Sequence, residues 1–334
     1  MQRALFLGTP FFGYYQHIIA AFRTRGYDVD YFNDRPGENP FLKGAIYVRP
    51  QFVDGIIRRY LQTILQQTRA NRYNIILVVN GKVFTPQFIE ELRRQHPEAE
   101  FVLYLWDPIE LYPRVLEFFA LFDRRYTFDA ADAQAHRDFR LLPLFYTHDY
   151  RAVGTAGRQS FDYDIVNVCT AHANRYSLMK SLIPEFSAAG IRVYSYLYLN
   201  PLRFAYNKVQ SDAFRRARAK EFNFSPLPVV DYVDVLRRSC AVLDVSHAVQ
   251  SGLTIRTIET LGARRKLITT NSDVRNYPFY DPSRVLVLDA AHLDVEALKL
   301  FIGQPQQVLE PAIYRKYGID CWLEEIISGE GIDR

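Results

Sequence analysis

The fold is decided by the stretch Gln250-Ser-Gly-Leu-Thr-Ile-Arg-Thr-Ile-Glu259, which runs on as Thr260-Leu-Gly-Ala-Arg-Arg-Lys-Leu-Ile-Thr-Thr-Asn271. This pattern predicts a glycine-containing loop, then a helix, then a buried strand from Lys266 to Thr270. A loop, helix and strand in this order belong to a βαβ unit and to a parallel sheet.

The start of the predicted helix is a candidate nucleotide site. Backbone N–H groups and the positive end of the helix dipole meet there, and both favour a phosphate group. Arg256 adds positive charge, and Glu259 can accept hydrogen bonds from ribose hydroxyls. The residues expected to contact the nucleotide are Gly252, Leu253, Thr254, Arg256 and Glu259. The alternative is an ordinary amphipathic helix with an arginine and a glutamate on its surface.

Length and composition point to a packed protein of two domains. The chain has 334 residues, of which 49% are hydrophobic and 23% charged, and its net charge is +4. Two domains of roughly 150 residues each are typical of this length. The positive charges are dispersed except in short runs such as Arg215 to Lys220, so nucleic-acid binding is disfavoured. A weak attraction to the inner membrane surface stays open.

Targeting signals give no indication of export. No apolar stretch approaches the roughly 20 residues of a membrane span, and the N-terminus MQRALFLGTP lacks a signal-peptide cleavage site. We therefore expect a cytoplasmic protein, peripheral at the membrane at most. The three scattered cysteines match neither a disulfide framework nor a metal site.

Strands and helices alternate along both halves of the chain. Short apolar strands are expected at 4–8, 28–32, 75–79, 101–106 and 125–128, and helices at 14–25, 53–70, 85–95 and 111–119. A polar, glycine-rich stretch within 141–161 is the predicted interdomain linker. After it, strands are expected at 163–169, 192–198, 241–245 and 285–288, and helices at 175–188, 233–238, 295–301 and about 311–327.

This alternation predicts an α/β protein with two Rossmann-like domains facing across a cleft. The first domain is expected over 1–150, the second over 151–310, and a C-terminal helical segment over 311–334. The last segment is a candidate for packing back on the first domain. In open α/β sheets ligands bind beyond the carboxyl ends of the strands, so residues directly after strands are the site candidates.

In the second domain, two further strand ends carry candidate donor residues. The strand ending at Cys169 runs into Thr170-Ala-His172-Ala-Asn174-Arg175, and His247 follows another strand. His172 and Arg175 stand near a predicted helix start and can form a second anion site. The alternatives are a helix cap at Asn174 with a surface arginine, and a purely structural role for His247.

In the first domain, the strand ends suggest an acceptor site and a general base. Asp107 follows a strand and is the leading candidate base, with His17 second. Helix capping is the alternative role for Asp107, and it is the preferred one for Asp129. Acceptor contacts are expected from Gly8, Gly13 and Lys82.

Several other chemistries lack their motifs. Gly8-Thr-Pro-Phe-Phe-Gly13 is not GxGxxG, because Pro10 and Phe11 replace the small residues that a dinucleotide requires. Phosphate-loop, HExxH, GxSxG and CxxC patterns are missing from the sequence. Asp162-Tyr-Asp164 is formally a DxD motif, but it stands at the start of a predicted strand, away from the carboxyl-end site. We therefore expect neither a bound metal nor a resident cofactor.

With these residues placed, the chain resembles the two-domain glycosyltransferases of the GT-B fold, and it looks similar to CgeB-like and bacterial surface-polysaccharide (lipopolysaccharide or capsule) transferases. The resemblance rests on 103–107 with 122–132, on 163–175, and on 250–271. It implies a C-terminal domain that binds the nucleotide sugar, with Glu259 on the ribose and Arg256 and Arg175 near phosphates, and an N-terminal domain that binds the acceptor. Ser251 stands where retaining members often carry a carboxylate, so the stereochemical course stays open.

The function expected from the resemblance is a metal-independent transfer of sugar from a nucleotide-sugar donor to a glycan or lipid-linked acceptor. The setting it implies is bacterial surface polysaccharide biosynthesis. A nucleotide-sugar epimerase of the same architecture is one alternative. A non-catalytic nucleotide- or glycan-binding protein is the other.

Overall fold

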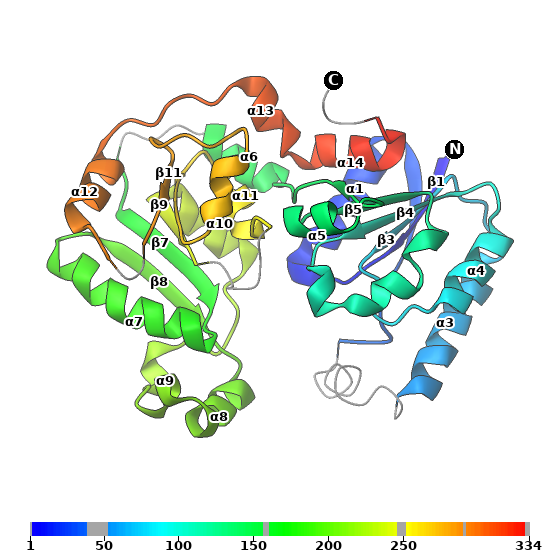
Figure 1. Ribbon diagram of the computed structural model, residues 1–334, viewed down its shortest axis with the longest axis horizontal. Coiled ribbons are helices and arrows are strands. Elements are labelled where there is room, and N and C mark those ends of the chain that lie inside the picture. Colours follow the sequence, from blue (N-terminus) through cyan, green and yellow to red (C-terminus); the bar gives the residue numbers. More distant parts are fainter. Residues whose placement is uncertain (1, 39–52, 156–159, 246–251, 290–291, 331–334) are drawn as a thin grey trace. The chain divides into compact units, whose positions relative to one another are not determined.

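The computed structural model describes residues 2–38, 53–155, 160–245, 252–289 and 292–330. The chain divides into two compact units (Figure 1). Unit 1 comprises Met1–Leu144, Gln250–Gly252 and Ile319–Arg334, and unit 2 comprises Phe145–Val249 and Leu253–Gly318. None of the described helices is long and apolar enough to cross a membrane.

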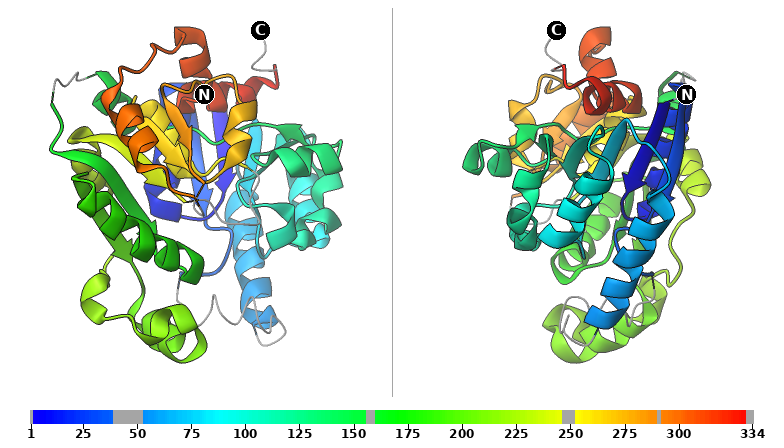
Figure 2. Two further views of the ribbon diagram at one scale, coloured as in Figure 1. Left: turned by 60° about the vertical axis from the view of Figure 1, so that its left-hand side comes forward. Right: turned by 90° about the vertical axis from the view of Figure 1, so that its right-hand side faces the viewer.

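Unit 1 is built on a parallel sheet of six strands in the order β2-β1-β3-β4-β5-β6. The strands are β1 (Gln2–Leu7), β2 (Tyr27–Phe32), β3 (Ile75–Val79), β4 (Glu100–Leu105), β5 (Arg124–Thr127) and β6 (Arg140–Leu141). The five residues of β3, Ile-Ile-Leu-Val-Val, are all buried. A strand that is apolar along its whole length needs cover on both faces of the sheet, and helices provide it (Figure 2).

Two of the helices of unit 1 begin at side-chain caps that the sequence supplies. They are α1 (Tyr14–Thr24), α3 (Asp54–Thr68), α4 (Pro86–Gln95), α5 (Ala130–Ala135) and α14 (Ile319–Ser328). Thr85 caps α4 by accepting a hydrogen bond from the Phe88 N–H, and Pro86 occupies the first helical position. Asp129 caps α5 through the N–H groups of Ala131 and Asp132, as the sequence predicts.

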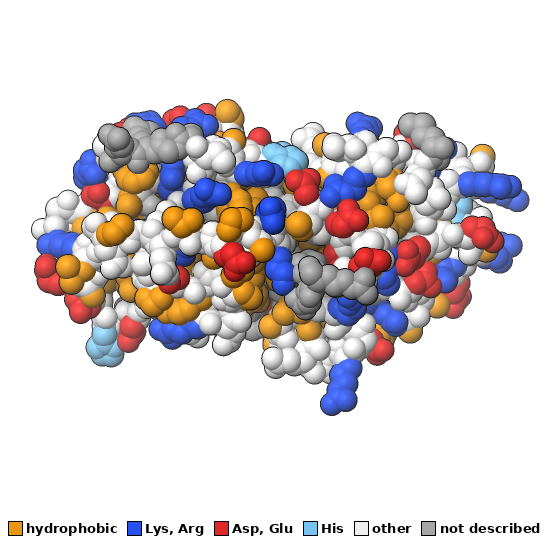
Figure 3. Space-filling model, turned by 90° about the horizontal axis from the view of Figure 1, so that it is seen from above, with side chains coloured by type: hydrophobic (Ala, Val, Ile, Leu, Met, Phe, Trp, Pro, Cys, Tyr) orange, Lys and Arg blue, Asp and Glu red, His pale blue; other side chains and the backbone are white. Residues whose placement is uncertain are grey.

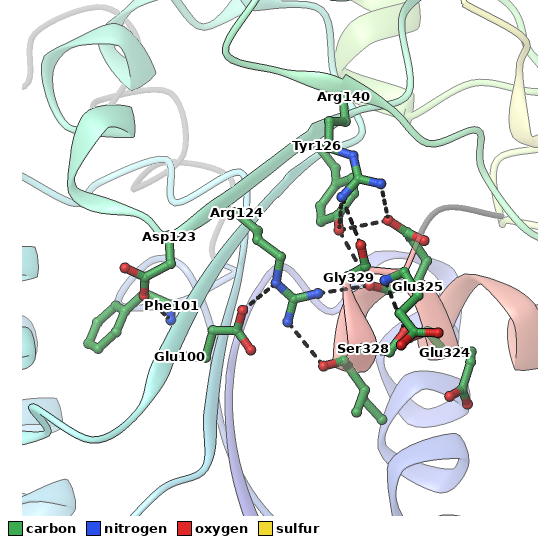
Figure 4. A network of polar contacts seen from close by, with 12 residues as sticks. Glu100, Phe101, Asp123, Arg124, Tyr126, Arg140, Glu324, Glu325, Ser328 and Gly329 are labelled. Atoms are coloured by element: carbon green, nitrogen blue, oxygen red, sulfur yellow. Dashed lines mark hydrogen bonds and ion pairs between the residues drawn. The ribbon is translucent and has the colours of Figure 1, made fainter. Parts of the chain in front are cut away.

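The C-terminal helix α14 belongs to unit 1 and is fixed there by polar contacts (Figure 4). Arg124 donates to the carbonyl oxygens of Glu325 and Ile327, each at 3.0 Å. The buried Glu325 carboxylate accepts from the Tyr126 hydroxyl at 2.8 Å and pairs with Arg140 at 3.0 Å. Trp322 packs edge-on against Tyr104 with ring centroids 5.0 Å apart, so α14 also supplies part of the unit 1 core.

Unit 2 is a parallel sheet of five strands in the order β11-β10-β9-β7-β8. The strands are β7 (Tyr163–Thr170), β8 (Val193–Tyr198), β9 (Ser239–Asp244), β10 (Lys266–Thr269) and β11 (Val285–Val287). Its helices are α6 (His148–Thr155), α7 (Ala173–Ala188), α8 (Pro201–Gln210), α9 (Asp212–Arg215), α10 (Val229–Arg237), α11 (Ile255–Gly262), α12 (Val295–Gly303) and α13 (Pro311–Lys316). Both sheets are wholly parallel and alternate with helices, which confirms the predicted α/β class.

The two strand orders follow one pattern. In each unit the first strand lies between the second and the third, so the chain reverses its direction across the sheet between β1 and β3, and again between β7 and β9. Ligands of open α/β sheets bind beyond the carboxyl ends of the strands at such a reversal. The residues that follow β1 and β3, and those that follow β7 and β9, are therefore the ones placed to bind.

The differences from the sequence prediction include three stretches. The segment 109–121 forms three short 3₁₀ turns instead of the helix expected over 111–119. Within the expected linker the chain forms α6, whose Tyr150 and Val153 are buried. The single helical stretch expected near 311–327 is broken into α13 and α14, which belong to different units.

Candidate functional site

The carboxyl ends of β7 and β9 in unit 2 hold one candidate site. Arg175, in the first turn of α7, donates from Nε to the carbonyl oxygen of Val245 at 2.7 Å. It thus bridges the two strand ends at which the sheet reverses. His172 is exposed and takes the cap position of α7, so the alternative cap at Asn174 is wrong.

The start of α11 is locked to the end of β9. Thr254 caps the helix by accepting from the Thr257 N–H at 3.1 Å. The buried Asp244 carboxylate accepts from the Thr254 hydroxyl and, at 2.8 Å, from the Thr257 hydroxyl. A negative charge at a helix N-terminus is favourable, so Asp244 fixes the position of this helix start. The sequence reasoning missed both Asp244 and Thr257, although Asp244 lies near the end of the strand expected over 241–245.

Arg256 and Glu259 contact each other inside unit 2. The Arg256 guanidinium pairs with the Glu259 carboxylate at 2.7 Å and lies 3.8 Å from the centroid of the Tyr232 ring. Glu259 is buried, and Arg256 is mostly so. Burial raises the pKa of the Tyr150 hydroxyl, and the Glu259 charge raises it further. Both proposed nucleotide contacts therefore belong to a compact buried cluster rather than to a solvated helix face.

Cys169 at the end of β7 reports on the charges around it. Burial raises the pKa of its thiol to about 11, Arg175 and Arg256 oppose that increase, and Asp244 adds to it. Electrostatic effects of this kind need proximity. The positive charges of Arg175 and Arg256 and the negative charge of Asp244 therefore all affect the end of β7.

The remaining donor candidates have separate outcomes. His247 lies outside the described residues. Leu253 is buried, and the Gly252 N–H donates to the Asp129 carboxylate at 2.7 Å.

Asp162 and Asp164 of the DxD motif pair with Arg238 and Arg192, each at 2.7 Å, so both serve ion pairs near the start of β7. In the described part of the chain, His, Cys, Asp and Glu side chains form no cluster of three or more that is able to hold a metal ion.

In unit 1, the ends of β3 and β4 bring Lys82 and Asp107 together. Lys82 Nζ lies 3.0 Å from Asp107 Oδ2, and the Asn80 side-chain amide donates to the same oxygen at 2.8 Å. Asn80 and Gly81 have φ values of 61° and 72°, a left-handed turn that glycine and asparagine tolerate. Helix capping is therefore not the contact that the structure gives Asp107.

A buried carboxylate that the sequence reasoning missed lies beside this pair. Asp34 follows β2 and is fully buried; the Lys82 N–H donates to its Oδ2 at 3.4 Å, and Arg35 Nε lies 3.6 Å from its Oδ1. Burial raises the pKa of Asp34, while Arg35 opposes that increase. Arg35 also donates to the Thr9 hydroxyl at 3.4 Å, which connects the ends of β2, β1 and β3. The position of Asp34, two residues after the strand expected over 28–32, is the feature of the sequence that could have indicated it.

Gly8 and Gly13 are required by the backbone and its packing. A Cβ on Gly8 would lie 2.8 Å from the Phe6 ring and 3.2 Å from Val79 Cβ. Gly13 has a φ of 79° at the N-cap of α1. His17 lies half-buried on α1, with its ring centroid 6.3 Å from that of Tyr14.

Two aromatic rings lie at the same edge of unit 1. Phe11 is exposed on the 3₁₀ turn after β1, and its ring centroid is 6.1 Å from that of Trp106, which follows β4. Because β3 lies between β1 and β4, this ring pair spans the end of β3, where Lys82 and Asp107 meet. The edge thus combines an aromatic surface with an ion pair.

Positive and negative side chains are mixed on one face of the molecule. On the face shown in Figure 3, Lys and Arg side chains are interspersed with Asp and Glu.

The fold and these strand-end sites define the class: the chain has the GT-B fold, which glycosyltransferases and nucleotide-sugar epimerases share. Similar solved structures include the UDP-forming α,α-trehalose-phosphate synthase of Burkholderia xenovorans in complex with glucose-6-phosphate, with a TM-score of 0.63, 13% identity and coverage of 98% of this chain and 99% of that one. HepE of Anabaena, solved with UDP and glucose, has a TM-score of 0.59 and 11% identity, with coverage of 98% of this chain and 100% of that one. The UDP-GlcNAc 2-epimerase of Methanocaldococcus jannaschii, solved with UDP-GlcNAc and UDP, has a TM-score of 0.54 and 9% identity, with coverage of 98% of each chain.

At these identities the similarity establishes the fold alone. No family model matches the chain, and no curated protein matches it in sequence.

Proposed function

We propose that this chain is a glycosyltransferase that moves a sugar from a nucleotide-sugar donor to a glycan or lipid-linked acceptor in bacterial surface polysaccharide biosynthesis. The observation that carries the proposal is the start of α11, which is anchored to the end of β9 and carries Arg256 and Glu259, while Arg175 bonds to Val245 directly after β9. This is the edge at which the fold class binds nucleotides.

Donor binding exchanges the internal partners of two residues. In the free protein Arg256 and Glu259 satisfy each other at 2.7 Å, which keeps a buried charge from being left alone. In the proposed complex the diphosphate takes Arg256 and the ribose hydroxyls take Glu259. Arg175, Arg256 and the helix start then stabilise the departing phosphate, the role that a divalent cation fills in metal-dependent transferases.

Acceptor binding is assigned to the edge of unit 1. The rings of Phe11 and Trp106 suit the apolar face of a sugar, and Lys82 and Asp107 suit its hydroxyls. Both described contacts of Asp107 use Oδ2, which leaves Oδ1 to take the proton of the attacking hydroxyl. The proposed reaction is a direct displacement with Asp107 as general base, and His17 is the second candidate.

A thermal-shift screen tests the donor site. We expect one of UDP, GDP, CDP, CMP or dTDP to stabilise the protein, by about 2.7 kcal/mol when it is present at 100 times its dissociation constant. Glu259→Gln should abolish most of that stabilisation. Glu296→Gln is the matched control, because it removes a carboxylate from an exposed i,i+3 ion pair of α12. If none of the five nucleotides stabilises the protein more than inorganic phosphate does, the proposal fails.

Asp107→Asn tests the chemistry. Loss of a general base typically lowers the rate by a factor of about 10² to 10⁴, so transfer should fall by that amount while nucleotide affinity is retained. Asp138→Asn, an exposed aspartate of unit 1, should leave transfer unchanged. Full transfer activity in Asp107→Asn would exclude Asp107 and leave His17→Gln as the next variant.

A nucleotide-sugar epimerase is the second candidate, favoured by the similar structure from Methanocaldococcus jannaschii. Incubation with the donor alone separates the two. An epimerase produces a new nucleotide sugar without any acceptor, whereas a transferase leaves the donor intact or slowly hydrolyses it. Nucleotide binding without any product, with any acceptor, would instead indicate a non-catalytic binding protein.

A further inference from the structure

Helix α8 of unit 2 carries an apolar stripe on its outer face. Leu202, Tyr206 and Val209 are 71%, 57% and 76% exposed, and the helix contains no buried residue. At about 100° per residue the three side chains lie within about 60° of one another around the helix axis. Because none of these three side chains is buried within unit 2, the helix presents a continuous apolar strip to its surroundings.

The opposite face of α8 holds the helix to unit 2. Phe204, roughly half a turn from Leu202 and Tyr206, packs against the rings of Phe222 and Phe224 at centroid distances of 5.4 and 5.6 Å. Lys208, one turn further on, donates from Nζ to the carbonyl oxygens of Arg215 and Ala217 at 2.9 and 3.0 Å. Because these contacts fix which face is inward, the exposure of the stripe follows from the packing of unit 2.

The segment around the stripe is strongly basic. Between positions 203 and 221 the sequence carries six cationic side chains and two acidic ones, a net charge of +4 that equals the net charge of the whole chain. Five of the cations are exposed: Arg203, Arg215, Arg216, Arg218 and Lys220. In Figures 1 and 2, α8 and α9 lie beyond the end of β8, at an extremity of unit 2.

We propose that α8 is a membrane-surface docking helix that inserts Leu202, Tyr206 and Val209 between the headgroups of an anionic lipid bilayer. An apolar strip flanked by arginine and lysine is the pattern of helices that lie in the plane of a membrane interface. Tyrosine suits that interface because its ring is apolar and its hydroxyl is polar. The surrounding cations are attracted to anionic headgroups.

Charge also decides against a second copy of the chain as the occupant. A two-fold symmetric contact through α8 would place two identical segments of net charge +4 against each other. Like charges at an interface are unfavourable. An anionic lipid surface matches the same segment in both its apolar and its charged character.

Vesicle co-sedimentation of the full chain tests the proposal. The protein should bind vesicles of phosphatidylcholine mixed with phosphatidylglycerol and should not bind vesicles of phosphatidylcholine alone. The double variant Leu202→Gln with Val209→Gln should weaken binding by about a hundredfold, because burial of each aliphatic side chain contributes about tenfold or more. Arg215→Gln with Arg216→Gln should weaken binding as well, and high salt should reproduce its effect.

The chain offers a matched control for the stripe. Leu300 and Val308, also in unit 2, are 74% and 88% exposed, so Leu300→Gln with Val308→Gln makes the same chemical change elsewhere. This variant should bind vesicles as the unchanged protein does. Equal losses in both double variants, or failure of the unchanged protein to bind the anionic vesicles, would overturn the proposal. So would a dimer in sedimentation equilibrium that the Leu202→Gln and Val209→Gln changes dissociate.

The test is independent of the proposed transferase function. Urea unfolding confirms that each variant is folded, and the nucleotide thermal shift reports on α11, which the α8 variants do not change. Vesicle binding without nucleotide binding would reject the transferase and keep the docking helix. Nucleotide binding without vesicle binding would reject the docking helix and leave the transferase proposal standing.

Discussion

At the scale of single residues, the contacts of Arg256 explain why the two proposed nucleotide contacts tolerate burial. Its guanidinium lies 3.8 Å from the Tyr232 ring centroid and 2.7 Å from the Glu259 carboxylate. The ring face holds the guanidinium plane and stays in place when the diphosphate replaces Glu259, so less side-chain entropy is lost when a phosphate binds. Tyr232 is thus a positioning residue for Arg256. No sequence pattern indicates this role, because Tyr232 lies on a different helix, α10.

Replacement of Tyr232 separates its ring from its hydroxyl. Tyr232→Phe keeps the ring face and should keep the affinity for the nucleotide that the screen identifies. Tyr232→Leu removes the ring, and loss of a desolvated cation–π contact of about 2 kcal/mol should weaken binding roughly thirtyfold. Isothermal titration calorimetry measures both. Tyr163→Leu, which removes the ring under Arg238 at 5.4 Å, is the control and should bind normally. Equal affinities for the Phe and Leu variants would show that the ring does not position Arg256.

Asp34 should make stability depend on pH. Because burial raises the pKa of Asp34 above its ordinary value of 3.8, the folded state holds the proton more tightly than the unfolded state. Its contribution to stability is therefore largest in acid and is lost as pH rises through the raised pKa. The loss is about 1.4 kcal/mol for every pH unit that separates the pKa of the folded state from that of the unfolded state. The Asp34→Asn variant should lack this dependence of stability on pH.

Urea unfolding of both proteins from acid to neutral pH measures the effect. The stability of the unchanged protein relative to Asp34→Asn should fall as pH rises. Asp138→Asn, an exposed aspartate, should run parallel to the unchanged protein. A relative stability that increases toward neutral pH would mean that the ion pair with Arg35 outweighs burial.

At the scale of elements, the sequence predicts those whose pattern is long and regular. The strands β1, β3, β4, β7 and β9 and the helices α1, α3, α4 and α7 are each expected within a few residues of their observed bounds. The segment 109–121 is not, because Pro108 and Pro113 interrupt the backbone N–H pattern and leave short 3₁₀ turns. The break between α13 and α14 is also missed.

The candidate sites likewise combine residues that the sequence indicates with pairings that it does not. Strand ends indicate Asp107, Lys82, Arg175 and Arg256 from the sequence, because parallel strands bring their carboxyl ends to one edge. The pairings of Lys82 with Asp107 and of Arg256 with Glu259 depend on side-chain conformation, which periodicity does not encode. The exposed stripe of α8 is hidden for a related reason: its apolar residues resemble a core-facing pattern until the packing shows that they point outward.

Arg124 makes two of the polar contacts that hold the end of helix α14 (Figure 4). Arg124 donates to two carbonyl oxygens of the last turn, and Arg124→Met leaves those carbonyls without that donor. We expect a loss of about 2 to 4 kcal/mol in the free energy of unfolding, since buried charged hydrogen bonds are costly to remove. Urea unfolding monitored by tryptophan fluorescence is suitable because Trp322 lies on α14. Arg114→Met, at an exposed i,i+3 pair with Glu117, should cost much less. A similar loss in both variants would mean that Arg124 contributes no specific contact.

At the scale of the whole molecule, the chain does not divide its two units at a single point. Unit 2 is almost continuous from Phe145 to Gly318, with only Gln250–Gly252 assigned to unit 1. Unit 1 is discontinuous, because it needs α14 from the far end of the chain. The buried side chains Trp322, Leu323 and Ile326 come from that helix. The two units should therefore differ in whether they survive as fragments.

Fragment expression tests this difference and also tests where the nucleotide binds. Fragment 145–318 contains the whole of the proposed donor cluster, so it should unfold cooperatively and bind the same nucleotide within about an order of magnitude of the full-length affinity. Fragment 1–144 lacks α14 and exposes the face of Tyr104 that Trp322 covers, so it should be unstable or aggregate. Joining 319–330 to it through a flexible glycine–serine linker should restore a cooperative transition, because the linker only has to hold α14 at high local concentration. Arg124→Met in the joined protein should lower that transition again. A fragment 1–144 as stable as the joined protein would show that α14 adds nothing to unit 1, whereas a folded fragment 145–318 without nucleotide affinity would show that Arg175, Arg256 and Glu259 do not suffice for the donor site.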